Sequence, residues 1–177
     1  ASIDRYSDAK RHLLYAINLK ADFAPAHASL GAVSSKLGEI QEAIQSCLTA
    51  IKLDPLLFDA FYNLGVINRD KGDIDSAIES YKKALAIQPN SIITLSNLLF
   101  TSSFVKIEDK EENFNLAKRY GEVVSMAAGS PFEHNISSSP KRLRIGFVSG
   151  DLRNHPVGYF LESFLSLSDQ SQLCLLY

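Results

Sequence analysis

The chain has 177 residues, of which 46% are apolar and 21% charged, a composition typical of a folded globular protein. Its formal net charge of −2, with basic and acidic residues interspersed, argues against nucleic acid or an anionic membrane surface as a partner. No apolar stretch approaches the roughly 20 residues of a membrane span, and the two cysteines, Cys47 and Cys174, form neither a disulfide framework nor a metal-ligand spacing, which favours a reducing, cytoplasmic location without a bound metal.

Both ends of the chain indicate a fragment. The sole methionine is Met126, so we expect Ala1 to lie inside a longer chain rather than at a start codon. The final apolar run, Leu173 to Tyr177, is typical of a buried strand, and we expect the natural chain to continue beyond it.

A repeat of 34 residues covers the first part of the chain. Small residues, leucines, glycines and prolines recur at this spacing. The equivalent positions are Ala9, Ala43 and Ala77; Leu30, Leu64 and Leu98; Gly31 and Gly65; Gly38 and Gly72; Pro55 and Pro89. This period and residue set resemble the tetratricopeptide repeat, in which two antiparallel helices cross closely at small residues.

The repeat predicts helical hairpins, with a first helix (helix A) at 24–37 and 58–71 and a second (helix B) at 40–53 and 74–87. A further helix B is expected within residues 1–20. A glycine follows each helix A, where the chain needs a turn with positive φ. Stacked hairpins form a right-handed α-α superhelix, and we expect its concave side, lined by helices A, to bind extended polypeptides.

The third unit departs from the pattern, since Leu99 replaces the glycine and Glu111 the alanine. A last helix at 111–128 is expected to cap the array with its apolar residues. These are Phe114, Leu116, Ala117, Tyr120, Val123, Val124 and Ala127. Residues 130–142, which contain prolines and consecutive serines, predict a linker, so that repeats and capping helices occupy 1–129 and a second domain 143–177.

The second domain begins with the pattern of a β-α-β unit. Residues 143–149 alternate and then become apolar, as in the first buried strand of a parallel sheet. A turn at 150–154 follows, Pro156 suits the first turn of a helix, and 173–177 predicts a second strand. We therefore expect the start of a Rossmann-like α/β domain.

The segment from Arg142 to Pro156, with its Asp-x-x-Asn-His-Pro turn, resembles the start of the catalytic region of protein O-linked N-acetylglucosamine transferases. Residues 96–101 and 116–121 resemble the junction between repeats and catalytic domain in bacterial members. The resemblance covers nearly the whole chain. It implies a two-lobed GT-B glycosyltransferase that transfers N-acetylglucosamine from UDP-GlcNAc to Ser or Thr hydroxyls without a metal.

The resemblance maps the histidine of this turn onto His155, at the active cleft, as a general base or a substrate-positioning group. An imidazole near neutral pKa suits either role. The alternative is that His155 or Asn154 caps the helix that begins at Pro156. The nucleotide sugar is expected to bind mainly in a second lobe beyond this chain, so no residue is assigned to it.

The residues after Pro156, Val157 to Phe160, are closer to bacterial and plant SPINDLY-like relatives, some of which transfer fucose. The resemblance therefore leaves two donors open, and a protein O-fucosyltransferase of the same family is an alternative.

Asn63 and Asn97 occupy the same position of helix A, one repeat apart, and Ser29 stands where the row would continue. The resemblance implies an asparagine ladder that holds the main chain of an extended substrate, because an amide offers both donors and acceptors to a peptide unit. The alternative is that both side chains are solvated or bond within their own repeat. For the whole chain, the rival to an enzyme fragment is a non-catalytic adaptor that binds proteins.

Overall fold

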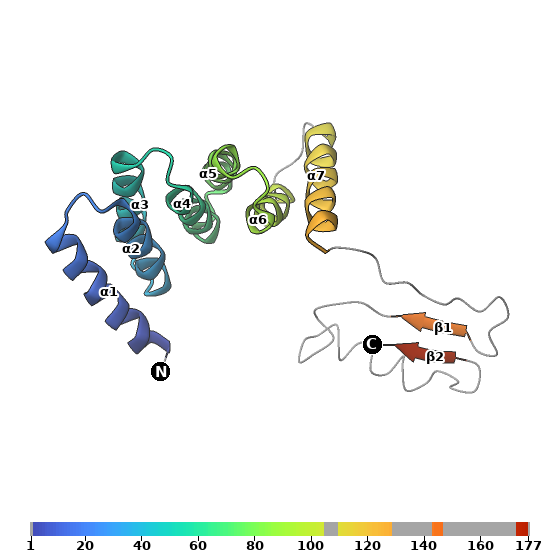
Figure 1. Ribbon diagram of the computed structural model, residues 1–177, viewed down its shortest axis with the longest axis horizontal. Coiled ribbons are helices and arrows are strands. Elements are labelled where there is room, and N and C mark those ends of the chain that lie inside the picture. Colours follow the sequence, from blue (N-terminus) through green and yellow to red (C-terminus); the bar gives the residue numbers. More distant parts are fainter. Residues whose placement is uncertain (1, 105–109, 129–142, 147–172, 177) are drawn as a thin grey trace. The chain divides into compact units, whose positions relative to one another are not determined.

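The computed structural model describes residues 2–104, 110–128, 143–146 and 173–176. The chain divides into two compact units, Ala1–Ser130 and Pro131–Tyr177. The described residues of the first unit are largely helical, whereas those of the second are strands (Figure 1), and each unit is described by itself.

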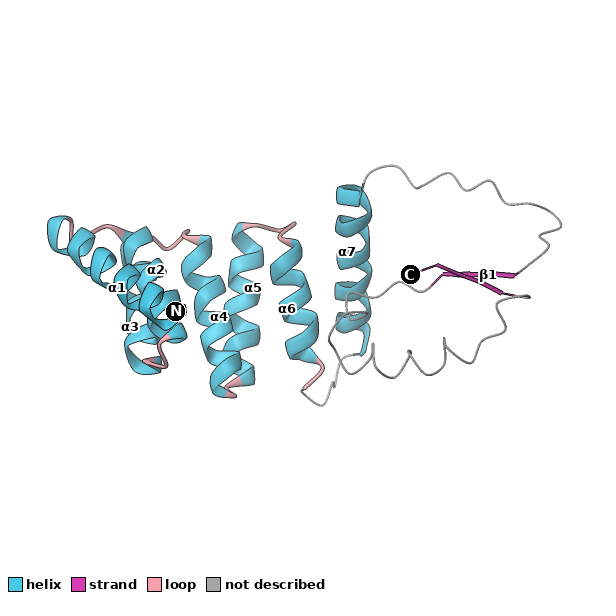
Figure 2. Cartoon of the chain, turned by 90° about the horizontal axis from the view of Figure 1, so that it is seen from below, coloured by secondary structure: helices cyan, strands magenta, loops and turns pink. Residues whose placement is uncertain are grey.

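The first unit contains seven helices within its described residues. They are α1 (Ser2–Leu19), α2 (Ala24–Lys36), α3 (Ile40–Leu53), α4 (Phe58–Lys71), α5 (Ile74–Ile87), α6 (Ile92–Ser102) and α7 (Lys110–Ala128). Helices α2, α4 and α6 are the helices A, and α3 and α5 the helices B of the first two repeats. Figure 2 shows α4, α5 and α6 side by side. The predicted bounds of α3, α4 and α5 are confirmed, and α2 ends one residue before its predicted bound.

Short sequence signals set these helix ends. Gly72 follows α4 with φ 86°, a left-handed conformation that glycine adopts without steric cost. The next residue, Asp73, caps α5 by accepting a hydrogen bond from the Ser76 backbone N–H at 3.3 Å. Ser91 caps α6 in the same way through the Thr94 backbone N–H. Helices α5 and α6 therefore begin at side-chain caps, whereas α2, α3 and α4 begin without one.

The core lies between the stacked helices and forms three clusters of buried residues. They are Ala28, Ala50 and Ala60; Ala43, Cys47 and Ile67; and Ala77, Tyr81, Leu85, Leu95 and Leu98. The first cluster consists of alanines, whose small side chains allow the helix axes to approach closely. Complete burial of a large side chain such as Leu95 stabilises the fold by about 1.5–3 kcal/mol.

Two glycines allow helices A and B of one hairpin to touch. A Cβ on Gly31 would lie 2.4 Å from Cys47 Sγ, and a Cβ on Gly65 would lie 2.6 Å from Tyr81 Cε1. Both distances are too short for real contacts. The pairs Gly31 with Cys47 and Gly65 with Tyr81 are equivalent under the repeat, so the second hairpin accommodates a ring where the first holds a thiol.

The third hairpin lacks this close approach. Leu99 stands at the position of Gly31 and Gly65, and α7 packs on the α5–α6 cluster through half-buried Leu116 and Tyr120. Phe114, which we predicted to belong to the apolar face of this helix, is 68% exposed. That prediction was wrong because residue 114 is two positions from Leu116 and thus on another side of the helix.

Helix α1 packs beside the first complete hairpin. Lys10 donates hydrogen bonds to Glu39 at 2.8 Å and to Glu42 at 2.7 Å, which ties α1 to the start of α3. The helix expected within residues 1–20 is confirmed over Ser2–Leu19.

The described part of the second unit is a pair of parallel strands, β1 (Leu143–Gly146) and β2 (Leu173–Leu176). Leu143 is aligned with Leu173 and Gly146 with Leu176. This parallel pairing agrees with the sequence prediction, although β1 is described only as far as residue 146. The helix predicted after Pro156 lies outside the described residues, so the structure does not show a complete β-α-β unit.

Candidate functional site

The row formed by Ser29, Asn63 and Asn97 runs across successive helices A, from α2 through α4 to α6. We call the surface that carries this row the A face. Ser29 is exposed, and both asparagines are half-buried. The repeat alone predicted their equivalent positions, and the structure adds the partners of each amide.

Asn63 links α4 to the preceding helix A. Its side-chain Nδ2 donates a hydrogen bond to the backbone oxygen of Ala28 at 3.1 Å. Among the described residues, no donor is recorded for Asn63 Oδ1. The Asn63 amide therefore retains acceptor capacity and one further N–H.

Asn97 makes two side-chain contacts to α4. Its Oδ1 accepts a hydrogen bond from Arg69 Nη1 at 2.9 Å, and its Nδ2 donates one to the Tyr62 hydroxyl at 3.2 Å. Both asparagines thus bond to the preceding repeat rather than within their own.

Arg69 is a functional candidate that the sequence reasoning missed. Its Nε and Nη2 donate to Asp70 Oδ1 at 3.0 and 2.7 Å, while Nη1 reaches Asn97. The side chain is only 23% exposed. Arg69 lies seven positions after Tyr62, and this i, i+7 spacing, which places both on one stripe of α4, is the signal that could have found it.

The ring of Tyr62 packs within its own repeat. It stacks on Phe58 at a centroid distance of 5.9 Å and lies 6.2 Å from the ring of Tyr81. The hydroxyl nevertheless faces Asn97. Tyr62 therefore combines a packing role with a polar contact on the A face.

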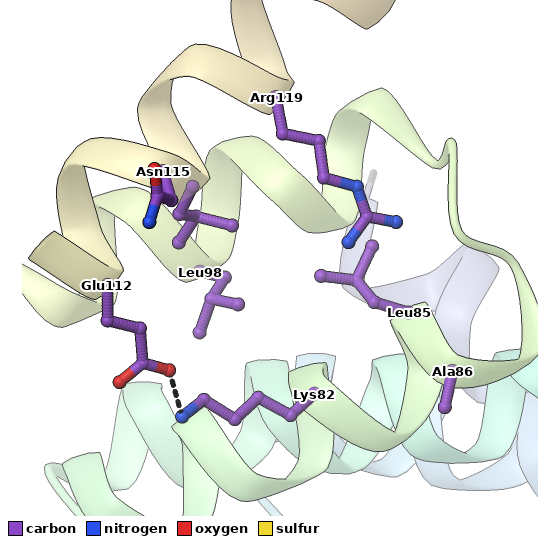
Figure 3. A pocket seen from close by; sticks show the side chains of 8 residues that line it. Lys82, Leu85, Ala86, Leu98, Glu112, Asn115 and Arg119 are labelled. Atoms are coloured by element: carbon purple, nitrogen blue, oxygen red, sulfur yellow. Dashed lines mark hydrogen bonds and ion pairs between the residues drawn. The ribbon is translucent and has the colours of Figure 1, made fainter.

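A second feature is an open cleft of about 440 Å³ between α5, α6 and α7. Figure 3 shows Leu98 between two polar ends of this cleft. At one end Lys82 pairs with Glu112, and at the other Arg119, which donates to the Pro89 backbone oxygen, lies above Leu85. Three of its lining residues lie on α5, one on α6 and four on α7.

Two buried titrating groups of the described helices, Cys47 and Tyr81, have raised pKa values. Burial raises the pKa of Cys47 to about 12, so its thiol stays protonated and is not a nucleophile. Burial likewise raises the pKa of Tyr81 to about 12. Within the described residues there is no cluster of His, Cys, Asp and Glu that could hold a metal ion. None of the described helices has both the length and the hydropathy to span a membrane.

His155, the predicted catalytic residue, lies outside the described residues, as do the predicted linker at 130–142 and the turn at 150–154. The structure therefore joins Asn63 of α4 to Ala28 of α2, and Asn97 of α6 to Tyr62 and Arg69 of α4. It does not place His155 relative to them.

Comparisons with known proteins identify the class of the helical unit. Residues 24–55 and 58–91 each match the tetratricopeptide repeat. The chain therefore contains tetratricopeptide repeats, as the 34-residue period predicted. No curated protein matches the sequence significantly.

Among solved structures, an O-GlcNAc transferase mutant of Thermobaculum terrenum is similar, with a TM-score of 0.70 and 27% identity over 98% of this chain and 34% of that one. The chain thus spans about a third of the transferase. A crystal structure of MamA has a TM-score of 0.62 and 26% identity over 71% of this chain and 72% of that one. MamA of Desulfovibrio magneticus, with a TM-score of 0.57, 20% identity and coverage of 72% and 70%, shows the same fold.

Proposed function

We propose that this chain contains the polypeptide-binding repeats and the first part of the catalytic domain of a protein O-glycosyltransferase. The observation that carries the proposal is the extent of the similarity. It covers 98% of the chain for the O-GlcNAc transferase and 71% for MamA. The helical unit accounts for 130 of 177 residues, so the transferase similarity extends into the unit that holds β1 and β2.

In this proposal the A face binds an extended acceptor polypeptide. The amides of Asn63 and Asn97 offer hydrogen bonds to main-chain groups, which every peptide carries, so binding tolerates many sequences. Asn63 supports this role best, because its Oδ1 has no recorded donor among the described residues. The formal net charge of −2 gives no reason to expect nucleic acid as a partner, so we propose polypeptide acceptors.

The domains then divide as the sequence suggested: repeats and capping helix at 1–129, a linker at 130–142 and the first part of a GT-B catalytic domain at 143–177. Parallel pairing of β1 and β2 is what such a domain requires at its start. His155 would act at the carboxyl end of β1 as general base or positioning group. The donor, UDP-GlcNAc or in the alternative a fucose nucleotide, would bind mainly beyond residue 177.

The rival proposal is an adaptor without catalysis. The likeness to MamA over the helical unit favours it, because this chain covers 72% of that structure's length but 34% of the transferase's. Both proposals include peptide binding at the A face, but only the transferase proposal includes sugar transfer.

The deciding experiment uses the protein at its full natural length. It is incubated with a Ser/Thr-rich peptide and either UDP-GlcNAc or GDP-fucose, and transfer is followed by mass spectrometry of the peptide. A mass increase with one donor supports the transferase and identifies the sugar. Peptide binding without transfer from either donor would establish the adaptor instead.

The A face is tested separately by titrating the 177-residue chain into a fluorescently labelled, unstructured Ser/Thr-rich peptide. The double variant Asn63→Ala/Asn97→Ala should weaken affinity, with each lost main-chain contact worth about 0.5–1.5 kcal/mol. Gln45→Ala is the matched control, since Gln45 carries an exposed amide on a helix B. Equal affinities for all three chains would remove the A face as the binding surface.

A further inference from the structure

The two asparagines of the A face are equivalent in sequence but are held by different groups. Nδ2 of Asn63 bonds to a backbone oxygen, that of Ala28. Nδ2 of Asn97 bonds instead to the hydroxyl of Tyr62, the residue that is equivalent to Ala28 one repeat later. Of the two asparagines, only Asn97 accepts a hydrogen bond from a guanidinium. In the repeat before Arg69, the equivalent position is occupied by Ser35.

The chemistry of these partners determines which way the Asn97 amide points. A guanidinium has donors and no acceptor, so Arg69 can bond to the oxygen of the amide and never to its nitrogen. With Oδ1 held by Arg69 and one N–H held by Tyr62, rotation of the amide by half a turn would bring two donors together at Arg69. The contacts therefore select one of the two amide orientations.

The fixed amide keeps one lone pair and one N–H for a ligand. These are the groups that pair with the N–H and C=O of a polypeptide main chain, but they do so only if oxygen and nitrogen are on the correct sides. Arg69 is itself fixed, because Asp70 Oδ1 accepts from its Nε and Nη2. A chain of contacts from Asp70 through Arg69 thus ends at Asn97.

We infer that Arg69 is a positioning residue of the A face: it orients the amide of Asn97 for main-chain binding without touching the polypeptide itself. The inference rests on the proposed peptide-binding function. Tyr62 accepts a hydrogen bond from Asn97 Nδ2 and so holds the nitrogen side of the same amide.

A double-mutant cycle on the full 177-residue chain tests this. Affinity for the labelled, unstructured Ser/Thr-rich peptide is measured for the parent, Arg69→Met, Asn97→Ala and the double variant. Methionine preserves much of the side-chain volume while removing every donor. Because each single variant loses one hydrogen bond to or behind the peptide, its Kd should rise roughly two- to tenfold. The double variant should bind no more weakly than Asn97→Ala, because Arg69 acts through Asn97.

The control is Lys71→Met, which removes the same charge from an exposed position of the same helix and should leave Kd unchanged. Melting curves of all variants separate binding from folding. If Arg69→Met fails to fold, Tyr62→Phe tests the same amide from its nitrogen side, since it keeps the ring that stacks on Phe58.

The outcomes are distinct. Additive losses in the cycle would show that Arg69 contacts the peptide directly and would overturn the positioning role. A loss in Asn97→Ala without one in Arg69→Met would overturn the inference and leave the proposed function intact. Unchanged affinity in Asn97→Ala would remove Asn97 from peptide binding, and the inference would fall with it.

Discussion

The backbone of Gly65 lies against the ring of Tyr81, so closely that a Cβ at residue 65 would be 2.6 Å from Cε1. This contact lets α4 and α5 cross tightly. It also makes the second hairpin sensitive to a single methyl group, because a buried ring has no room to move.

Gly65→Ala should therefore destabilise the protein by about 1–3 kcal/mol, the usual cost of overpacking, although alanine favours helices. Gly121→Ala is the matched control. Gly121 lies in α7 with no atom near its missing Cβ, so this change should stabilise the protein by about 0.5–1 kcal/mol. Urea denaturation measures both, and a stabilised Gly65→Ala variant would contradict the packing described here.

The thiol of Cys47 should be unreactive in the folded protein. It is fully buried, and burial raises its pKa to about 12, whereas thiolate is the form that alkylates. Iodoacetamide at neutral pH should leave Cys47 unmodified until urea unfolds the chain. Mass spectrometry of the peptide that contains Cys47 distinguishes it from Cys174, and modification without denaturant would refute the prediction.

The sequence predicted the first two hairpins well because their signals are local. Glycine and proline mark the ends of α2 to α5, and small residues mark the crossings, so the helices follow from the 34-residue period. The third hairpin was harder to predict. Its apolar residues have mixed spacing, and only the packing of Leu116 and Tyr120 shows that Phe114 faces away.

For Asn63 and Asn97, the sequence predicted equivalent positions on successive helices A but not the groups that bond to their amides. The repeat placed Asn63 and Asn97 on one row, since equivalent residues of stacked repeats are neighbours. It could not show that Asn97 bonds to Arg69 and Tyr62, because Ala28 and Ser35 stand at the equivalent positions of the earlier repeat. The partners of Asn97 are residues that differ between the repeats. A comparison that looks only for residues shared by the repeats does not find them.

Removal of the Tyr81 hydroxyl should not harm the protein. This buried oxygen has no hydrogen-bond partner among the described residues. Tyr81→Phe should therefore be neutral at pH 7 or stabilise the fold by up to about 1 kcal/mol. A loss of stability beyond this range in thermal or urea unfolding would show that the hydroxyl has a partner.

The same variant has a signature at alkaline pH. Burial raises the pKa of Tyr81 from 10.0 to about 12, so the unfolded state ionises first. Between these two pH values the folded state keeps the phenol proton that the unfolded state releases, so the free energy of unfolding falls as pH rises from 10.0 toward about 12. Tyr81→Phe should lose less stability over this range than Tyr62→Phe, which retains Tyr81. Cys47 contributes a similar loss in both variants.

His155→Ala tests the catalytic assignment in the full-length protein. A general base contributes about 10² to 10⁴ in rate, so sugar transfer to a Ser/Thr peptide should fall by that factor. Stability should change by less than about 1 kcal/mol. If His155 caps a helix instead, His155→Ala should lose stability while transfer persists, and His155→Asn should restore the stability.

The backbone conformation of the turn after α4 favours a D-amino acid over an L-amino acid. Gly72 has φ 86° and ψ 7°, and nothing lies within 4 Å of its missing Cβ. An L-alanine there would be strained by about 1–2 kcal/mol, whereas a D-alanine has its own favoured conformation in this region. In a chemically synthesised chain, the mirror-image residue would adopt this backbone conformation without strain and would restrict the unfolded chain, an effect that stabilises proteins by about 0.4–1 kcal/mol. The achiral glycine thus occupies a position whose preferred substituent is one that ribosomes do not supply.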